Sequence, residues 1–327
     1  MNQSDHVSST GTIKLLSVRA LVVRFGERTV LDGLSFDVRA GEIFGLLGPN
    51  GSGKSTAFQA LAGLVAPASG DLALSGEPMR TGDRRLRARL GVVFQQPSVD
   101  PRLTARENLG LAAALYRVPR AKRTERVEAM LHFAELRDRA DEPVSQFSGG
   151  MRRRLELSRA MLHDPELLLM DEPTTGLDEP SFQRTWARLD ELRRTQGVTI
   201  VLTTHRPEEA ERCDRLAIMD AGRIVTVDTP GGLRGRVAGD VLELRTREPE
   251  RVSQLLSAEL GLASTVDADL VRIEAPRGHA LIPRIVETLP AGTLESVSMR
   301  RPGLGDAFLV LTGRSLASDV APQQSSS

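Results

Sequence analysis

The sequence has one cysteine, few aromatic residues, no excess of charge and no long apolar run. Cys213 alone excludes an internal disulfide and a cysteine-based zinc site, and we expect it to be a small buried apolar side chain in a reducing compartment. The 43 Lys and Arg residues balance the 43 Asp and Glu residues, so bulk charge gives no attraction for nucleic acid. Apolar stretches such as 198–202 are too short to cross a bilayer. The polar residues 1–10 resemble no signal or transit peptide. These absences predict a cytosolic protein that neither spans a membrane nor binds nucleic acid.

A length of 327 residues predicts about two domains, and a cluster of glycines at 229–239 marks a change in composition between them. The sequence pattern therefore predicts four parts: a disordered N-terminus (1–11), a first domain (12–235) with a helical subdomain at about 100–163, a C-terminal α+β accessory domain (240–315) and a disordered tail (316–327).

The first domain shows strand and helix signals in a mixed order. Residues 13–38 alternate between apolar and polar side chains, which predicts an early antiparallel sheet. The apolar runs at 167–170 and 198–202 predict buried parallel strands. Between them, Trp186 lies on the apolar stripe of a helix predicted to start at Pro180 and end at Gly197, so we expect it to anchor the core.

The second domain reads as strand, helix, two strands, helix and strand, which is the order of a ferredoxin-like fold. A short apolar segment, 305–312, follows this unit.

A glycine loop lies between a predicted strand, 42–47, and a predicted helix. It fits the pattern G-x-x-x-x-G-K-[ST], whose backbone N–H groups and helix N-terminus bind phosphate, and it contains one of only three lysines in the chain. Lys54 is expected to reach the β- and γ-phosphates of a nucleotide, and the Ser55 hydroxyl to bind Mg²⁺. The predicted nucleotide-binding residues are Gly48, Pro49, Asn50, Gly51, Ser52, Gly53, Lys54, Ser55 and Thr56.

A pair of carboxylates ends the apolar run at 167–170. Asp171 is expected to hold Mg²⁺ through water, and Glu172 to act on the attacking water as the general base. Alone, the pair would favour a solvated turn; beside the glycine loop it favours catalysis.

Together with five further motifs in order, these residues resemble the ATP-binding subunit of an ABC transporter over about 13–230. The resemblance implies a P-loop α/β core with a parallel sheet, an antiparallel β subdomain and a helical subdomain. It also implies roles for residues outside the loop: Phe25 stacks on adenine, Gln95 contacts the metal and water, Ser148, Gly149, Gly150 and Met151 form the signature that faces the ATP of a second subunit, Asp178 belongs to the D-loop, and His205 contacts the γ-phosphate.

Two departures from the family pattern concern the signature. Phe147 and Met151 flank it, so the glutamine of the usual LSGGQ is missing, while the main-chain donors remain. Arg152, Arg153 and Arg154 follow, and they predict either a solvated face or an electrostatic role near phosphate. Gln96 follows Gln95, and we assign the metal contact to Gln95 because it comes directly after the apolar strand.

Within the family, the segments around Gln95, Ser148 and Asp171 and the C-terminal appendix resemble the ABC-2 branch of drug-resistance, sodium-export and nodulation-type export ATPases. That resemblance implies an ATPase that binds two MgATP as a homodimer, on the cytoplasmic face of the membrane, and drives export of a drug, lipid, polysaccharide or ion through a separate permease. The alternatives are a soluble ABC ATPase of translation or DNA repair and a small-molecule kinase, which would have no use for Ser148 or His205.

Overall fold

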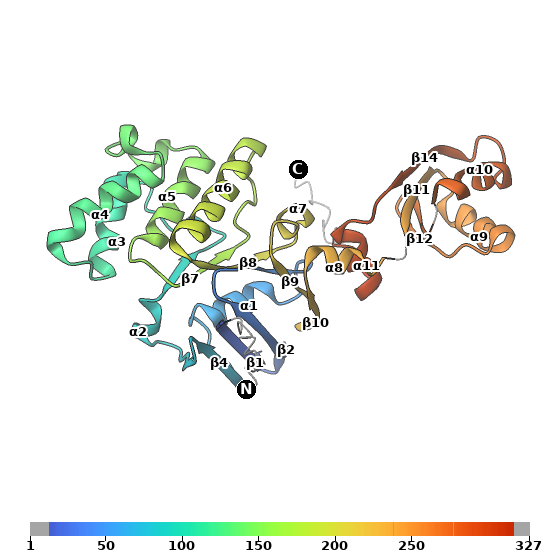
Figure 1. The fold of residues 1–327 in the computed structure, drawn as a ribbon. Coiled ribbons are helices and arrows are strands. Elements are labelled where there is room, and N and C mark those ends of the chain that lie inside the picture. The colour runs from blue at the N-terminus through green and yellow to red at the C-terminus, as the bar shows by residue number, and fades with distance from the viewer. Residues whose placement is uncertain (1–12, 238, 277, 317–327) are drawn as a thin grey trace, which may run out of the picture. The chain divides into compact units, whose positions relative to one another are not determined.

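The computed structural model describes residues 13–237, 239–276 and 278–316. The chain forms two compact units, and the division along the sequence falls between Asp228 and Thr229 (Figure 1). The expected disordered N-terminus, 1–11, lies outside the described residues, as does the expected tail, 316–327, apart from residue 316. The division falls before the glycine cluster because helix α8 (Pro230–Arg234) packs against α11 (Leu304–Thr312) of the second unit.

A six-stranded sheet forms the centre of the first unit, in the order β10-β9-β3-β8-β7-β6. All neighbours from β9 to β6 are parallel, and β10 pairs antiparallel with β9 at one edge. Strands β3, β7 and β8 are buried along their whole length, which explains why they read as continuous apolar runs. The strands are β3 (Ile43–Leu47), β6 (Leu90–Val93), β7 (Leu167–Asp171), β8 (Thr199–Thr204), β9 (Arg215–Asp220) and β10 (Arg223–Asp228).

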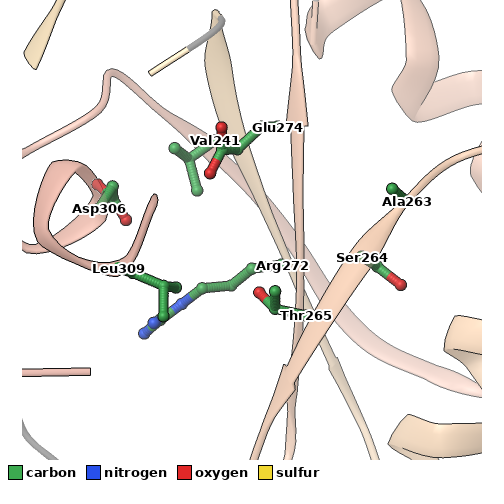
Figure 2. A pocket seen from close by; sticks show the side chains of 8 residues that line it. All are labelled: Val241, Ala263, Ser264, Thr265, Arg272, Glu274, Asp306 and Leu309. Carbon is green, nitrogen blue, oxygen red and sulfur yellow. The ribbon is translucent and has the colours of Figure 1, made fainter. Parts of the chain in front are cut away.

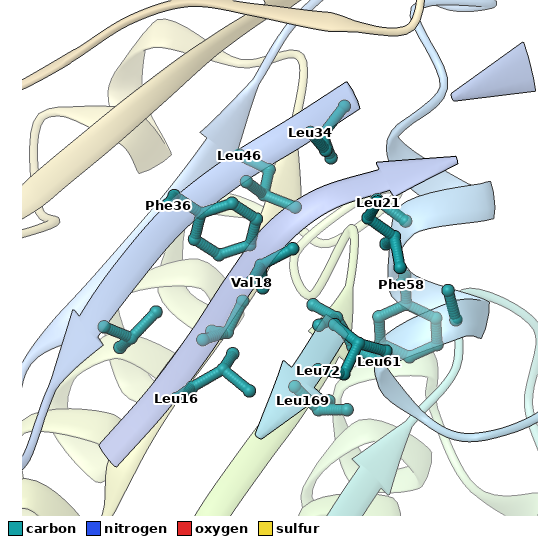
Figure 3. Packing of buried hydrophobic residues seen from close by; sticks show 14 of the residues in the cluster. Leu16, Val18, Leu21, Leu34, Phe36, Leu46, Phe58, Leu61, Leu72 and Leu169 are labelled. Carbon is teal, nitrogen blue, oxygen red and sulfur yellow. The ribbon is translucent and has the colours of Figure 1, made fainter. Parts of the chain in front are cut away.

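A second sheet is antiparallel, as the alternation of apolar and polar residues at 13–38 predicts, and it packs on the same core. Its order is β2-β1-β4-β5, formed by β1 (Lys14–Phe25), β2 (Arg28–Arg39), β4 (Ser69–Leu74) and β5 (Glu77–Pro78). Leu16, Val18 and Phe36 point from these strands toward Phe58 of α1 (Lys54–Leu61) and Leu169 of β7 (Figure 3). Helix α1, which follows the glycine loop, is thereby fixed between the two sheets.

Helices make up the remainder of the first unit, and α3, α4 and α5 pack against one another (Figure 1). Thr104 and Glu107 form the predicted capping box at the start of α3. The α-helices are α2 (Arg84–Arg87), α3 (Ala105–Leu115), α4 (Arg120–Phe133), α5 (Gly149–Met161), α6 (Glu179–Gln196) and α7 (Pro207–Ala210), and two 3₁₀ turns, η1 (Arg137–Arg139) and η2 (Val144–Gln146), precede α5.

The second unit has the predicted β-α-β-β-α-β order, and its antiparallel sheet has the order β12-β13-β11-β14. The first and third strands lie at the centre, as in ferredoxin-like folds. The apolar segment at 305–312 is helical and forms most of α11. The elements are β11 (Asp240–Thr246), α9 (Pro249–Leu260), β12 (Ser264–Asp267), β13 (Leu270–Ala275), α10 (Gly278–Thr288) and β14 (Leu294–Arg300).

The two faces of this small sheet differ in polarity. Leu242, Leu244 and other apolar side chains pack with α9 and α10 on one face. On the other face, Arg300 donates to Glu243 at 2.9 Å and to Asp306 of α11 at 2.7 Å. A hollow of about 230 Å³ lies beside these groups, and the Arg272 guanidinium extends into it between Thr265 and Leu309 (Figure 2).

No helix among the described residues has the length and hydropathy that crossing a bilayer would need.

Trp186 tests the packing of α6 against the sheet. Its side chain is fully buried beside Phe182, and its indole N–H has no hydrogen-bond partner in the described part of the chain. We expect Trp186→Ala to lower the free energy of unfolding by about 3–5 kcal/mol, because it opens a large cavity. Trp186→Phe should cost much less, since it keeps a ring and removes an unsatisfied donor. Equal losses for both variants in urea denaturation would contradict this account.

Candidate functional site

Four neighbouring parallel strands end at one edge of the central sheet, and each continues into a predicted site residue. The glycine loop follows β3, Glu172 follows β7, His205 follows β8, and Gln95 comes shortly after β6. Ligands of open parallel sheets bind outside the carboxyl ends of the strands, so this edge is the candidate site.

The glycine loop turns directly into α1, which starts at Lys54. Gly53 has a φ of 100°, a conformation that strains residues with a Cβ, and it caps the helix. At Gly48, an added Cβ would lie 2.4 Å from the Met219 carbonyl oxygen, so only glycine fits. The loop can therefore present its backbone N–H groups, together with the helix N-terminus, to an anion.

The Lys54 ammonium is almost completely buried at the base of this loop. Its Nζ donates to the carbonyl oxygens of Gly48 and Pro49, both at 2.8 Å. Burial lowers the pKa of Lys54, while the charges of Glu172 and Asp171 act in the opposite direction. The lysine is thus a desolvated cation that faces two carboxylates, and a phosphate would interact with it strongly.

Asp171 ends β7 beside the loop and accepts a hydrogen bond from the Thr203 hydroxyl. The pKa of this carboxyl group is raised, mainly by burial. The hydroxyls of Thr203 and Ser55 and the charge of Lys54 act in the opposite direction. The Ser55 hydroxyl and the Asp171 carboxylate are oxygen donors, which is the ligand chemistry that Mg²⁺ prefers. These residues fit a magnesium ion bound together with nucleotide phosphates.

Glu172 is hydrogen-bonded on both carboxylate oxygens. Gln95 Nε2 donates to its Oε2 at 3.0 Å, the Thr175 hydroxyl donates to the same oxygen at 3.2 Å, and His205 Nδ1 lies 3.0 Å from Oε1. The hydrogen bond with His205 is the largest cause that lowers the pKa of Glu172, against a burial effect that raises it. The structure therefore brings Gln95, Glu172 and His205 together around an ionised carboxylate.

The backbone at Glu172 has a φ of 45°, a left-handed conformation that is unusual for a residue with a long side chain. Its N–H donates to the carbonyl oxygen and hydroxyl of Thr203 on the neighbouring strand, which holds this conformation in place. Strain of this kind costs of the order of 1–3 kcal/mol and concentrates at functional sites.

The signature residues open α5, as predicted. The Ser148 hydroxyl caps the helix by accepting from the Met151 N–H at 3.3 Å, and Gly149 and Gly150 form its first turn. A Cβ at Gly150 would lie 2.5 Å from the Ser181 hydroxyl oxygen, so the start of α5 packs closely on the first turn of α6.

Asp178 caps α6, because its carboxylate accepts from the Ser181 N–H at 3.0 Å. Hydrogen bonds from the Ser181 hydroxyl and from its backbone N–H lower the pKa of Asp178. The D-loop residue thus has a local structural role that the sequence motif did not reveal.

Several predicted residues lie apart from the carboxylate cluster. Phe25 ends β1 with 51% of its surface exposed. Within the described ranges, no hydrogen bond links Ser148–Met151 or Asp178 to the Lys54 loop, and Gln96 makes none to Glu172. The metal contact assigned to Gln95 stays a prediction.

Of the two possibilities predicted for the three signature arginines, the solvated face is wrong for Arg153. Its side chain is 8% exposed and donates to the carbonyl oxygens of Pro173 at 2.7 Å and Phe94 at 2.8 Å. The i,i+3 spacing to Glu156 was the signal available in the sequence, because it places both side chains on one helix face.

Glu209 is a second residue that the sequence analysis missed. It lies in α7, is buried, and accepts from the Thr174 N–H at 3.1 Å and from the Thr174 hydroxyl. It joins the segment after His205 to the segment after Glu172. Only the tertiary fold brings these segments together, so no local sequence pattern indicates this contact.

Comparison with known proteins agrees with this geometry. Residues 31–175 match the family described as ABC transporter. The Nod factor export ATP-binding protein I of Ralstonia nicotianae is 42% identical over 316 residues, covering 94% of this chain and 96% of that protein. The chain belongs to the ABC transporter family. The protein of the same name from Paraburkholderia xenovorans is also 42% identical to this family member, over 89% of the chain and 95% of that protein.

Solved structures of the ABC transporter family share the fold. The cbiO1 protein of Clostridium perfringens, part of the ABC transporter complex cbiONQ, has a TM-score of 0.64 at 25% identity and covers 76% of this chain and 96% of its own. A dimeric ATP-binding cassette bound to ADP and Pi has a TM-score of 0.59 at 28% identity, over 66% of this chain and 98% of that one. This ABC transporter subunit is an ATP-binding protein and an ATPase.

The contact between His205 and Glu172 generates a prediction on pH dependence. If the Glu172 carboxylate is needed for hydrolysis, activity is lost as the pH falls through its pKa, which His205 lowers. In His205→Ala the pKa of Glu172 rises, so the acid limb of the kcat profile should move to higher pH. Thr175→Val removes a weaker donor and should move it less. Identical acid limbs in all three proteins would contradict this account.

Proposed function

We propose that the chain is the ATPase subunit of an ABC-2 type export transporter, which closes head to tail with a second copy around two MgATP and drives a separate membrane permease. The observation that carries the proposal is the ionised Glu172, held by Gln95 and His205 beside the Lys54 loop.

Nucleotide binding rests on the loop and on α1. The backbone N–H groups of residues 48–56, which all but Pro49 carry, surround the α- and β-phosphates, and Lys54 exchanges its two carbonyl contacts for the β- and γ-phosphates. Phe25, exposed at the end of β1, stacks on the adenine.

Ser55, Asp171 and Gln95 are the residues that would hold Mg²⁺, with Asp171 acting through water. When bound, the ion neutralises charge that develops on the β- and γ-phosphates. The buried Asp171 carboxylate, bonded to Thr203 and influenced by Ser55, supports this ligand set.

Hydrolysis requires a base that is ionised and correctly oriented. Glu172 accepts a proton from the attacking water, and the lowered pKa keeps its carboxylate available at neutral pH. Gln95 fixes one carboxylate oxygen, and His205 holds the other and extends toward the γ-phosphate. Side chains that follow three different strands thus orient the attacking water relative to the phosphate that is cleaved.

Dimerisation supplies the second phosphate contact. Ser148, Gly149 and the first turn of α5 form an exposed helix N-terminus that is suited to the γ-phosphate bound by the partner copy. The dimeric cassette with ADP and Pi is similar in fold, which supports this arrangement for a homodimer of our chain.

Export is supported by relatives that align with nearly the whole chain and are named Nod factor export ATP-binding protein I. We place the subunit on the cytoplasmic face of the membrane, where Leu111 and Leu115 of α3, 53% and 73% exposed, offer an apolar surface to a cytoplasmic helix of the permease. A hollow next to Leu115 is lined by arginines such as Arg84 and Arg117.

The catalytic assignment predicts the behaviour of Glu172→Gln. The amide cannot accept the proton, so hydrolysis should fall by roughly 10²–10⁴-fold while ATP binding persists. The variant should therefore accumulate as an ATP-bound dimer in size-exclusion chromatography. Lys54→Ala, which loses the phosphate contact, should form no such dimer. Parental hydrolysis by Glu172→Gln would refute the assignment.

The transport assignment predicts a membrane partner. From membranes of the natural host, the full chain should purify with an integral membrane protein that stimulates its ATPase activity. Leu111→Asp should weaken this association and stimulation, while Val286→Asp, which changes an equally exposed residue of the second unit, should not. Purification with ribosomes or DNA, or phosphate transfer to a metabolite, would favour the alternatives over export.

A further inference from the structure

Three charged residues on α5 lie one turn apart on the same helix face: Arg153, Glu156 and Arg159. They follow the signature residues along the helix and contact two other segments of the first unit. Those segments are 94–98, which contains Gln95, and Pro173, which follows Glu172.

Arg153 joins both segments to the helix. Its Nε donates to the Pro173 carbonyl oxygen at 2.7 Å, and its Nη1 donates to the Phe94 carbonyl oxygen at 2.8 Å. One planar guanidinium therefore fixes the backbone next to Gln95 and next to Glu172, with a geometry that a lysine ammonium cannot reproduce.

Glu156 and Arg159 hold the other end of segment 94–98. The Ser98 N–H donates to Glu156 Oε1 at 2.6 Å, and Arg159 Nη2 donates to the Ser98 hydroxyl at 2.6 Å. Glu156 Oε2 accepts from Arg153 at 3.2 Å, so the two contacts are joined by an ion pair. Gln95 lies between two anchored backbone positions.

Stability alone does not explain this ion pair. The side chains of Arg153 and Glu156 are 8% and 2% exposed, and the desolvation of such a pair offsets much of its attraction. Apolar residues of similar size would fill the same space without that cost. What they could not do is fix the Phe94 and Pro173 carbonyl groups and the Ser98 N–H group.

We propose that Arg153, oriented by Glu156, is a positioning residue that ties the signature helix to Gln95 and Glu172 of the same subunit. Contact between the start of α5 and the nucleotide of the partner copy then sets the geometry of the subunit's own carboxylate. The inference rests on the roles proposed above for Gln95 and Glu172.

The test compares full-length Arg153→Met with Arg126→Met as a matched control. Arg126 also donates to two carbonyl groups, those of Met161 and Leu162 at the far end of α5, and both distances are 2.8 Å. Arg126 lies on α4, so the control removes two carbonyl contacts made to α5, together with an ion pair to Asp164, without touching segments 94–98 or 173. Each protein is assayed for kcat, for the KM of ATP, for the Mg²⁺ concentration at half-maximal rate, and for thermal unfolding.

In Arg153→Met we expect kcat to fall by about tenfold or more, as for a misplaced catalytic group, with the KM of ATP changed less than about twofold. The Mg²⁺ concentration at half-maximal rate should rise, because Gln95 loses an anchor. Arg153→Lys keeps the charge and one carbonyl contact, so it should recover part of kcat. Arg126→Met should alter thermal unfolding alone.

The proposal is overturned if Arg153→Met keeps the parental kcat and Mg²⁺ dependence, or if Arg126→Met loses activity to the same extent. Should Arg153→Met not fold, Arg159→Gln provides the test, because it weakens the hold on Ser98 from a less buried position; an unchanged Mg²⁺ dependence there would count against the proposal. Failure of the parental protein to hydrolyse ATP would refute the proposed function instead, so the two failures are distinguishable.

Discussion

The whole site depends on one constraint: a single carboxylate, Glu172, must stay ionised and correctly oriented while it is nearly buried. Burial alone would raise its pKa, and hydrogen bonds from Gln95, Thr175 and His205 oppose that effect. Gln95 and His205 lie far from Glu172 in the chain, so they meet it only if β6, β7 and β8 pair in parallel and end at one edge. The order of the strands in the sheet is therefore a requirement of the chemistry, and the left-handed backbone at Glu172 is tolerated because the neighbouring strand holds it.

Charge is matched inside the first unit, and this matching links distant parts of the site. Lys54 faces Asp171 and Glu172, and Arg153 is paired with Glu156. Each of these charges would be costly to bury by itself, and each has partners that satisfy it. The same partners fix backbone segments, so the groups that lower the cost of burial also set positions. The contacts that stabilise the buried charges are therefore the same contacts that position the proposed catalytic groups.

The sequence predicted the features that local chemistry determines. The spacing of Gly48, Gly53 and Lys54 is readable because a phosphate loop is a continuous segment, and the β-α-β-β-α-β order of the second unit follows from local periodicity. Gln95 and His205 came from family resemblance, since nothing local to either residue indicates Glu172 as its partner. Arg153 was misplaced because burial depends on which segments pack over a helix, and α8 was assigned to the first domain because its contact with α11 is distant in sequence.

The close approach between Gly150 and Ser181 limits how far the starts of α5 and α6 can move relative to each other. There is no room for a side chain at Gly150, and Ser181 is bonded through its N–H to Asp178, so the leading ends of α5 and α6 are pressed together. The starts of α5 and α6, which carry Ser148 and Asp178, then move together. A bulky residue in place of Gly150 would push the starts of α5 and α6 apart. A single substitution would then displace both Ser148 and Asp178.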